Sequence, residues 1–87
     1  MKTIYKYQLA RVDRQTLQMP KSACLLTVQI QRDDPCVWAL IDTANELTPV
    51  TFITVGTGQP DLHLECYAYI GTYQYRLFVF HVFASAT

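Results

Sequence analysis

Arginine and aromatic residues are the side chains of this 87-residue chain best suited to hold a planar, anionic ligand. A guanidinium binds phosphate through paired hydrogen bonds, and a flat aromatic ring stacks on a base. Arg11 and Arg76 are the candidates for a phosphate, and Tyr67, Tyr69 or Trp38 for stacking. Cross-strand aromatic packing is the competing interpretation for the tyrosines, and a place in the core is the competing one for the tryptophan.

The loop Gly56-Thr57-Gly58-Gln59-Pro60 is a candidate for a ligand contact, with the amides of Gly56-Thr57-Gly58 facing an anion. Glycine tolerates positive φ, so the amides of such a loop can converge on a negative charge. The phosphate-binding fingerprints also require a following helix, which this sequence does not predict. A plain turn between two strands therefore remains the simpler interpretation.

His81 is the one polar residue among Leu77, Val79 and Phe83 on its face of the last expected strand. It could titrate, contact a ligand or act as a base, or it could make one hydrogen bond inside a core. No serine, cysteine or carboxylate is placed by the sequence to complete a triad with it. The acidic residues lie at expected loops and strand ends, without the spacing of a paired acid and base. We therefore expect no catalytic residues and no enzymatic activity.

The three cysteines, Cys24, Cys36 and Cys66, include no Cys-x-x-Cys pair and are odd in number. We expect free thiols that pack as small hydrophobic side chains. A zinc site that adds His63 or His81 is the alternative, but its spacing matches no familiar ligand pattern. The prediction is no metal and no cofactor.

The length and the charge of the chain limit its class. Residues 1–87 suffice for one domain, and the formal net charge is zero. A surface that binds the phosphate backbone would need an excess of basic residues, so we expect no general nucleic-acid binding. We see no signal peptide and no apolar stretch long enough for a membrane helix, so a cytoplasmic location is the default expectation.

Seven segments have the composition or alternation of short strands, and turn-forming residues separate them. They are residues 3–9, 15–19, 24–31, 36–42, 50–55, 66–72 and 77–84. This pattern predicts an all-β fold, a small antiparallel sandwich or partly open barrel, with at most one helical turn at residues 61–66. Pro20 predicts that the second strand lies at an edge or ends there.

Two strands carry more specific expectations. Residues 24–31 alternate, which predicts Leu26, Val28 and Ile30 on the inner face and a hairpin with the following strand. The last strand is apolar on both faces, so either the sandwich covers it or a second copy of the chain does. The second possibility predicts a homo-oligomer.

Several segments, in order along almost the whole chain, resemble one family of small uncharacterised proteins encoded mainly by phages and prophages, a domain of unknown function. They include Met19-Pro20, Trp38-Ala39-Leu40-Ile41-Asp42, Gly56-Thr57-Gly58, Tyr69-Ile70-Gly71-Thr72 and Phe80-His81-Val82-Phe83. The turn at Gln74-Tyr75-Arg76 is a departure, because it is shorter and lacks glycine. The resemblance implies no established activity and transfers no catalytic residue.

The resemblance does imply a setting, since small accessory phage proteins are frequently counter-defence factors. Our first expectation is a homo-oligomer that sequesters a nucleotide-derived host immune signal without converting it. The alternative is a protein-interaction module that binds and inhibits a host defence protein. A small enzyme centred on His81 is the third reading.

Overall fold

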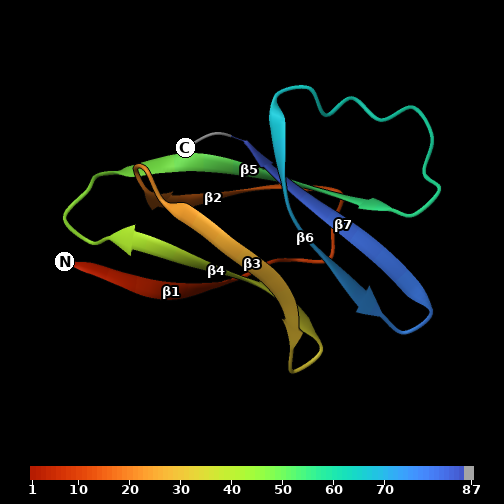
Figure 1. Ribbon diagram of the computed structural model, residues 1–87, viewed down its shortest axis with the longest axis horizontal. Helices are drawn as coiled ribbons and strands as arrows, with labels where there is room; N and C mark the ends of the chain where they lie inside the picture. The colour runs from red at the N-terminus through yellow and green to blue at the C-terminus, as the bar shows by residue number, and fades with distance from the viewer. Residues whose placement is uncertain (86–87) are drawn as a thin grey trace.

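Seven antiparallel strands make up the computed structural model, which describes residues 1–85 (Figure 1). The expected all-β class is confirmed. The strands are β1 (Lys2–Gln8), β2 (Arg14–Pro20), β3 (Cys24–Gln31), β4 (Asp34–Asp42), β5 (Leu47–Gly56), β6 (Tyr67–Tyr75) and β7 (Phe78–Ser85). Within this described part the chain has no helix, including at residues 61–66, and hence none long and apolar enough to span a membrane.

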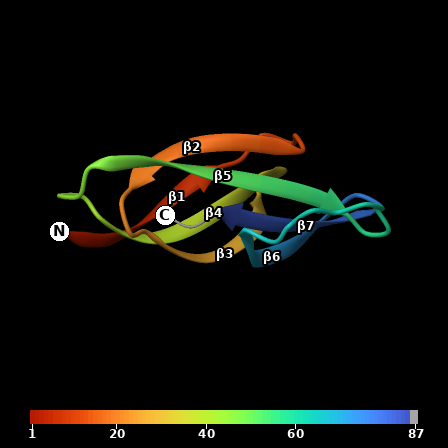
Figure 2. The same ribbon diagram turned by 90° about the horizontal axis from the view of Figure 1, so that it is seen from above.

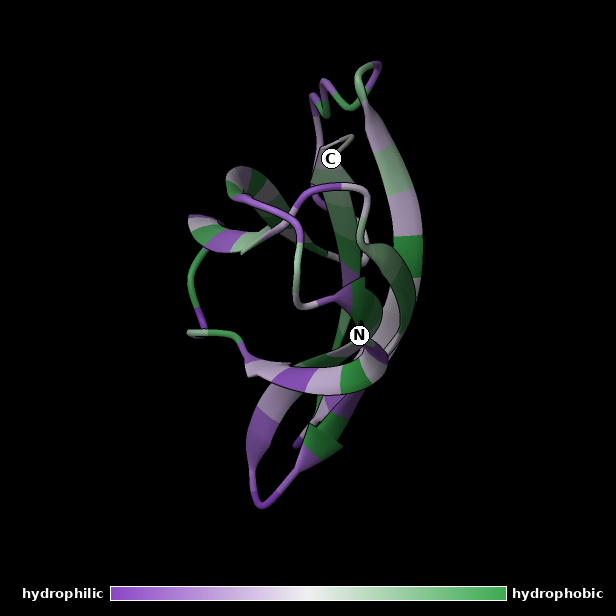
Figure 3. Cartoon of the chain, turned by 90° about the vertical axis from the view of Figure 1, so that its left-hand side faces the viewer, coloured by the Kyte–Doolittle hydropathy of each residue, from purple (hydrophilic) through white to green (hydrophobic). Residues whose placement is uncertain are grey.

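The strands form a three-stranded sheet A, in the order β1-β4-β3, and a four-stranded sheet B, in the order β2-β5-β7-β6. The two sheets face each other as the layers of a sandwich (Figure 2). β2 lies at an edge of sheet B, as Pro20 predicted. Hydrophobic and hydrophilic bands alternate along the strands, and the β3–β4 turn at the bottom of Figure 3 is hydrophilic.

The core lies between the sheets, and every second residue of the central strands contributes its side chain to it. Val37, Ala39 and Ile41 of β4 face Val50 and Phe52 of β5, and all five are buried. Side chains of a strand point alternately to opposite faces, so the intervening residues of each strand lie on the outside of the sandwich. Trp38 is one of these residues. The interpretation of it as a core tryptophan is therefore wrong.

The two sheets come closest where β3 packs beside β6. A Cβ atom added at Gly71 of β6 would lie 2.5 Å from Cγ1 of Val28 and 3.2 Å from its backbone nitrogen. Only glycine fits at this position without a shift of one strand. Gly71 thus fixes the spacing between the sheets along this side of the sandwich.

A β-bulge corrects the expected facing of β3. The register with β4 shifts between Leu25 and Thr27, so two residues of β3 oppose one residue of β4. Val28 and Ile30 keep their inward positions, but Leu26 is 46% exposed. The alternation of apolar and polar residues in the sequence continues through the bulge. The alternation of inward and outward side chains along β3 does not, because the bulge shifts it by one residue.

The two hairpin turns are tighter than the sequence suggested. Arg32 and Asp33 form the β3–β4 turn, both with positive φ, the backbone pattern of a type I′ turn. The β6–β7 turn consists of Arg76, at φ 58°, and Leu77. Because this turn takes only two residues, β6 continues to Tyr75 rather than ending at residue 72.

The cysteines only partly match the expectation that all three pack inside. Cys36 is buried, but Cys24 and Cys66 are exposed. Cys24 opens β3 on the outer face of sheet A, opposite Leu40, and Cys66 lies in the turn before β6. No group of three or more histidine, cysteine or acidic residues within residues 1–85 is placed to hold a metal ion.

Candidate functional site

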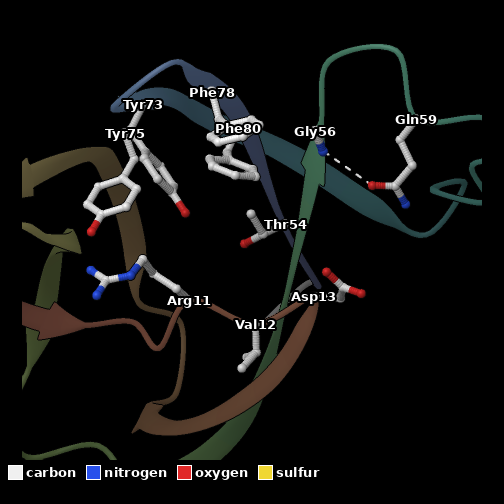
Figure 4. Close-up of a pocket in the computed structure, with 10 residues that line it drawn as sticks. All are labelled: Arg11, Val12, Asp13, Thr54, Gly56, Gln59, Tyr73, Tyr75, Phe78 and Phe80. Carbon is white, nitrogen blue, oxygen red and sulfur yellow. Dashed lines mark hydrogen bonds between the residues drawn. The ribbon is translucent and has the colours of Figure 1, made fainter.

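A pocket of about 390 Å³ lies at the end of the sandwich where the β1–β2 connection, the β6–β7 hairpin and the end of β5 meet (Figure 4). Its volume is within the range of about 300–1,000 Å³ that is typical of small-molecule sites. The lining residues are Arg11, Val12, Asp13, Thr54, Gly56, Gln59, Tyr73, Tyr75, Phe78 and Phe80.

Aromatic rings from the β6–β7 hairpin form one wall of the pocket. Tyr73 is paired with Phe80 and Tyr75 with Phe78 across the hairpin, so all four side chains lie on the same face. The ring of Phe80 lies 5.4 Å from that of Tyr73 and 6.2 Å from that of Phe78, with interplanar angles of 35° and 34°. Phe78 is 62% exposed, so this wall presents ring surface that no other side chain covers.

Two guanidinium groups converge on the Tyr75 ring at one end of this wall. The Cζ atom of Arg11 lies 4.6 Å from the ring centroid, and that of Arg76 lies 5.3 Å from it. Arg11 comes from the β1–β2 connection and Arg76 from the β6–β7 turn, so the fold joins residues far apart in the sequence. The ring faces attract both cations, which concentrates positive charge at the mouth of the pocket.

Arg11 also contacts the β3–β4 turn. Its Nη1 atom donates to the backbone carbonyl of Asp33 and lies 3.2 Å from a carboxylate oxygen of Asp34. Both side chains of the ion pair are about two-fifths exposed. A pair this open contributes about 1 kcal/mol or less, so a phosphate group can compete for the guanidinium.

Tyr73 lies at the buried side of the aromatic wall and is only 5% exposed. Burial raises the pKa of its hydroxyl above the ordinary value, because the ionised form would lose its hydration. The guanidinium of Arg11 acts in the opposite direction and lowers that pKa. The hydroxyl is thus a neutral group at the base of the pocket.

Hydrogen bonds donated by two backbone amides hold the opposite end of the pocket in place. The amide of Thr54 donates to the carbonyl of Asp13, at 2.9 Å. The side-chain oxygen of Gln59 accepts from the amide of Gly56, at 3.2 Å, which orients the amide group of Gln59. The carboxylate of Asp13 has no hydrogen bond and no ion pair with any residue from 1 to 85.

A second polar cluster lies on the outer face of sheet B, away from the pocket. The hydroxyl of Tyr69 lies 2.6 Å from Oγ1 of Thr72, and that oxygen lies 2.9 Å from Nδ1 of His81. On the other side of the ring, Nε2 of His81 lies 2.7 Å from Oγ1 of Thr57. Both ring nitrogens are therefore engaged, and neither is free to take a proton from a substrate or to bind a metal without breaking a hydrogen bond.

The residues singled out from the sequence are divided among several places. Arg11 and Gly56 line the pocket, and Arg76 lies over Tyr75 at its mouth. The others lie elsewhere: Thr57, Tyr67, Tyr69 and His81 on the outer side of sheet B, Gly58 at the tip of the loop after β5, and Trp38 on the outer face of sheet A.

The glycine loop uses most of its amides internally. The amide of Gly56 donates to Gln59, and that of Thr57 donates to the carbonyl of Val79, at 3.1 Å. Gly58 has a φ of 88°, the conformation for which a glycine is suited. Gly56 and Thr57 therefore have no amide hydrogen available for an anion, and Gly56 contributes to the pocket as a lining residue.

Sequence reasoning missed most of the aromatic wall. Tyr73 and Tyr75 lie in the segment that was expected to be a turn, and Phe78 and Phe80 were considered only as faces of the last strand. The signal was present: Gly71, Tyr73 and Tyr75 alternate in continuation of β6. Asp13 and Thr54 gave no signal, because only the fold brings them to the pocket, whereas Gln59 belongs to the glycine loop that the sequence had singled out.

A family described as Domain of unknown function (DUF7352) matches residues 1–87, so the chain belongs to this family. Neither the curated proteins nor the solved structures include one that matches the chain. The family match supplies no residue roles, and the pocket geometry is the basis for a function.

Proposed function

We propose that this DUF7352 protein binds a small nucleotide-derived ligand in the pocket at the end of its sandwich and does not convert it. The observation that carries the proposal is the convergence of Arg11 and Arg76 on Tyr75, beside an open aromatic wall. A base stacks on the wall, and an attached phosphate binds the two guanidinium groups. Base stacking contributes about 1–3 kcal/mol, and guanidiniums bind phosphate through charge-assisted hydrogen bonds.

The assignment of individual residues changes from that expected from the sequence. Arg11 and Arg76 retain the phosphate role. The stacking role passes from Trp38, Tyr67 and Tyr69 to the wall of Phe78, Phe80 and Tyr75. In this proposal His81 and Thr57 stabilise the fold and do not contact the ligand.

The biological setting is part of the proposal. The sequence resemblance to phage and prophage proteins supports an accessory protein that acts in the host cytoplasm and sequesters a nucleotide-derived immune signal. Sequestration needs binding without turnover, which fits a pocket that joins stacking and charged groups. Leu77, 93% exposed at the tip of the β6–β7 hairpin, and Val79, which does not line the pocket, supply apolar surface for a homo-oligomer.

Native mass spectrometry tests the binding and the assembly together. The protein is measured as purified from its expression host, and again after addition of cyclic and ADP-ribose-type nucleotides. We expect an oligomer that gains discrete, unconverted nucleotide masses. Arg11→Gln and Arg76→Gln should each weaken binding about tenfold or more, the loss of one charged hydrogen-bond partner. Arg14→Gln is the matched control, because Arg14 bonds Tyr67 on the outer face of sheet B. If Arg11→Gln and Arg76→Gln bind the nucleotide as tightly as the Arg14→Gln control does, the proposed site is wrong.

A second candidate is a protein-interaction module that inhibits a host defence protein. It is favoured by one observation, the exposed apolar tip formed by Leu77, Phe78 and Val79. Stoichiometric copurification of a host protein that Leu77→Asp abolishes would support this function. Leu77 does not line the pocket, so nucleotide binding should survive that change if the first proposal holds.

A further inference from the structure

The two ends of the pocket differ in charge, and this difference bears on which base it takes. Arg11 lies at one end of the pocket and Asp13 at the other, with Thr54 between them (Figure 4). For a ligand with its phosphate at the guanidinium end and its base on the wall, Asp13 is the charged group at the other end of the same pocket.

Asp13 is held in position by bonds that do not use its carboxylate. Its carbonyl accepts from the amide of Thr54. The preceding turn is closed by Gln15, whose side chain accepts from the amide of Ala10, at 2.9 Å, and donates to its carbonyl, at 2.8 Å. The carboxylate itself has no partner among the residues that the structure describes, so both of its oxygens remain available as acceptors.

Gln59 adds a donor on the same side of the pocket. Because its side-chain oxygen accepts from the amide of Gly56, its NH₂ group is turned the other way. Asp13 and Gln59 thus present two carboxylate acceptors and at least one amide donor.

From this arrangement we infer that the pocket selects guanine, with Asp13 as the residue that reads the base. The inference rests on the proposed function, since it concerns the same pocket. The Watson–Crick edge of guanine carries two adjacent donors, N1–H and the N2 amino group, followed by the O6 acceptor. A carboxylate accepts from both donors at once, and the Gln59 amide donates to O6. Adenine and cytosine each offer one donor next to an acceptor, and uracil offers one donor between two acceptors.

Calorimetric titration with four probes tests the inference: guanosine, inosine, adenosine and uridine 5′-monophosphates. Guanosine monophosphate should bind at least about tenfold more tightly than adenosine monophosphate, because the mismatched base leaves the carboxylate facing an acceptor. Inosine monophosphate lacks the N2 amino group and should bind with intermediate affinity.

Two variants identify the groups that read the base. Asp13→Asn keeps the size of the side chain and the backbone hydrogen bond with Thr54. The variant should bind guanosine monophosphate only as tightly as adenosine monophosphate. Gln59→Glu keeps an acceptor for the Gly56 amide but replaces the donor that faces O6, so it should also weaken guanosine monophosphate selectively. Glu46→Gln, an exposed acid in the loop between β4 and β5, is the control and should change nothing.

The outcomes separate the inference from the proposed function. Equal affinity for all four probes overturns the guanine preference and leaves a phosphate-and-stacking site. A guanine preference that survives Asp13→Asn also overturns the inference, because Asp13 then does not read the base. If none of the four probes binds, and the nucleotide panel gives no bound mass either, the proposed function fails together with the inference.

Discussion

The pocket and the outer face of sheet B both contain aromatic and polar side chains, but these side chains differ in how far they bond to one another. On the outer face, Tyr69, Thr72, His81 and Thr57 are bonded to one another in a continuous chain. In the pocket, the carboxylate of Asp13 has no bonded partner within residues 1–85, and much of the Phe78 ring is uncovered. Polar groups that satisfy one another stabilise the fold, whereas open groups in a concave surface are available to a ligand.

Gly71→Ala should have the largest effect, because it affects both regions. β6 carries Tyr73 and Tyr75 toward the pocket and Tyr69 and Thr72 toward the outer face. A Cβ atom at Gly71 would overlap Val28, and overpacking of this kind costs about 1–3 kcal/mol. Urea denaturation should show that loss.

The double variant Gly71→Ala with Val28→Ala is the control for this prediction. It removes the side-chain atom that lies 2.5 Å from the added methyl group, so the double variant should lose less stability than the sum of its two single changes. Strict additivity would show that the close approach of β3 and β6 does not limit this position.

Phe78→Ala should separate binding from stability. The side chain is mostly exposed, so the unfolding midpoint should change little, whereas loss of one stacking surface should weaken ligand binding by about 1–3 kcal/mol. Leu77→Ala is the matched neighbour, because it is even more exposed and does not line the pocket. An equal loss of nucleotide affinity in both variants would argue against the aromatic wall as the binding surface.

His81→Ala should have the opposite result. The change removes the imidazole that joins Thr57 to Thr72, and two partly solvated hydrogen bonds together contribute about 1–2 kcal/mol. The stability loss should appear in thermal unfolding, and ligand affinity should stay the same. Thr57→Val removes one of these bonds and should cost about half as much. A loss of binding without a loss of stability would move the site to the outer face.

Tyr73→Phe should have the smallest effect on stability, and this effect should depend on pH only in the alkaline range. Burial raises the pKa of Tyr73 in the folded state, so its stabilising contribution is complete below the ordinary value of 10.0 and is lost as pH rises through the folded pKa. The difference in unfolding free energy between the variant and the unaltered protein should therefore be constant below about pH 10 and shift in favour of the variant above it. Arg11→Gln should raise the pKa of Tyr73 further, since the guanidinium lowers it. A difference that is independent of pH would contradict the burial of this hydroxyl.

The fold could be predicted largely because its signals are local. Alternation and turn-forming residues located all seven strands, and Pro20 placed β2 at an edge. The errors have local causes that a pattern does not reveal. Leu26 turns outward because a bulge inserts one residue, and β6 extends to Tyr75 because Arg76 adopts a positive φ that usually calls for glycine or asparagine.

The pocket could be predicted only in part, because its contacts join distant segments. Arg11 and Arg76 were chosen for their chemistry, but nothing in their spacing indicates that both approach Tyr75. Tyr67 and Tyr69, two of the stacking candidates, share a face of β6, but that face is on the outside of sheet B. The sequence pattern predicts the two-residue period of a strand. It does not predict which face is buried when both faces carry apolar or aromatic residues.

The segment between β1 and β2 crosses from one sheet to the other, and this has a mechanical consequence. Arg11 is bonded to the β3–β4 turn of sheet A, whereas Tyr75 and Arg76 belong to the hairpin of sheet B. A displacement of one sheet relative to the other would therefore change the separation between the guanidinium and the ring. A phosphate bound by both Arg11 and Arg76 would link sheet A to sheet B. Relative motion of the two sheets should therefore be smaller in the ligand-bound protein than in the free protein.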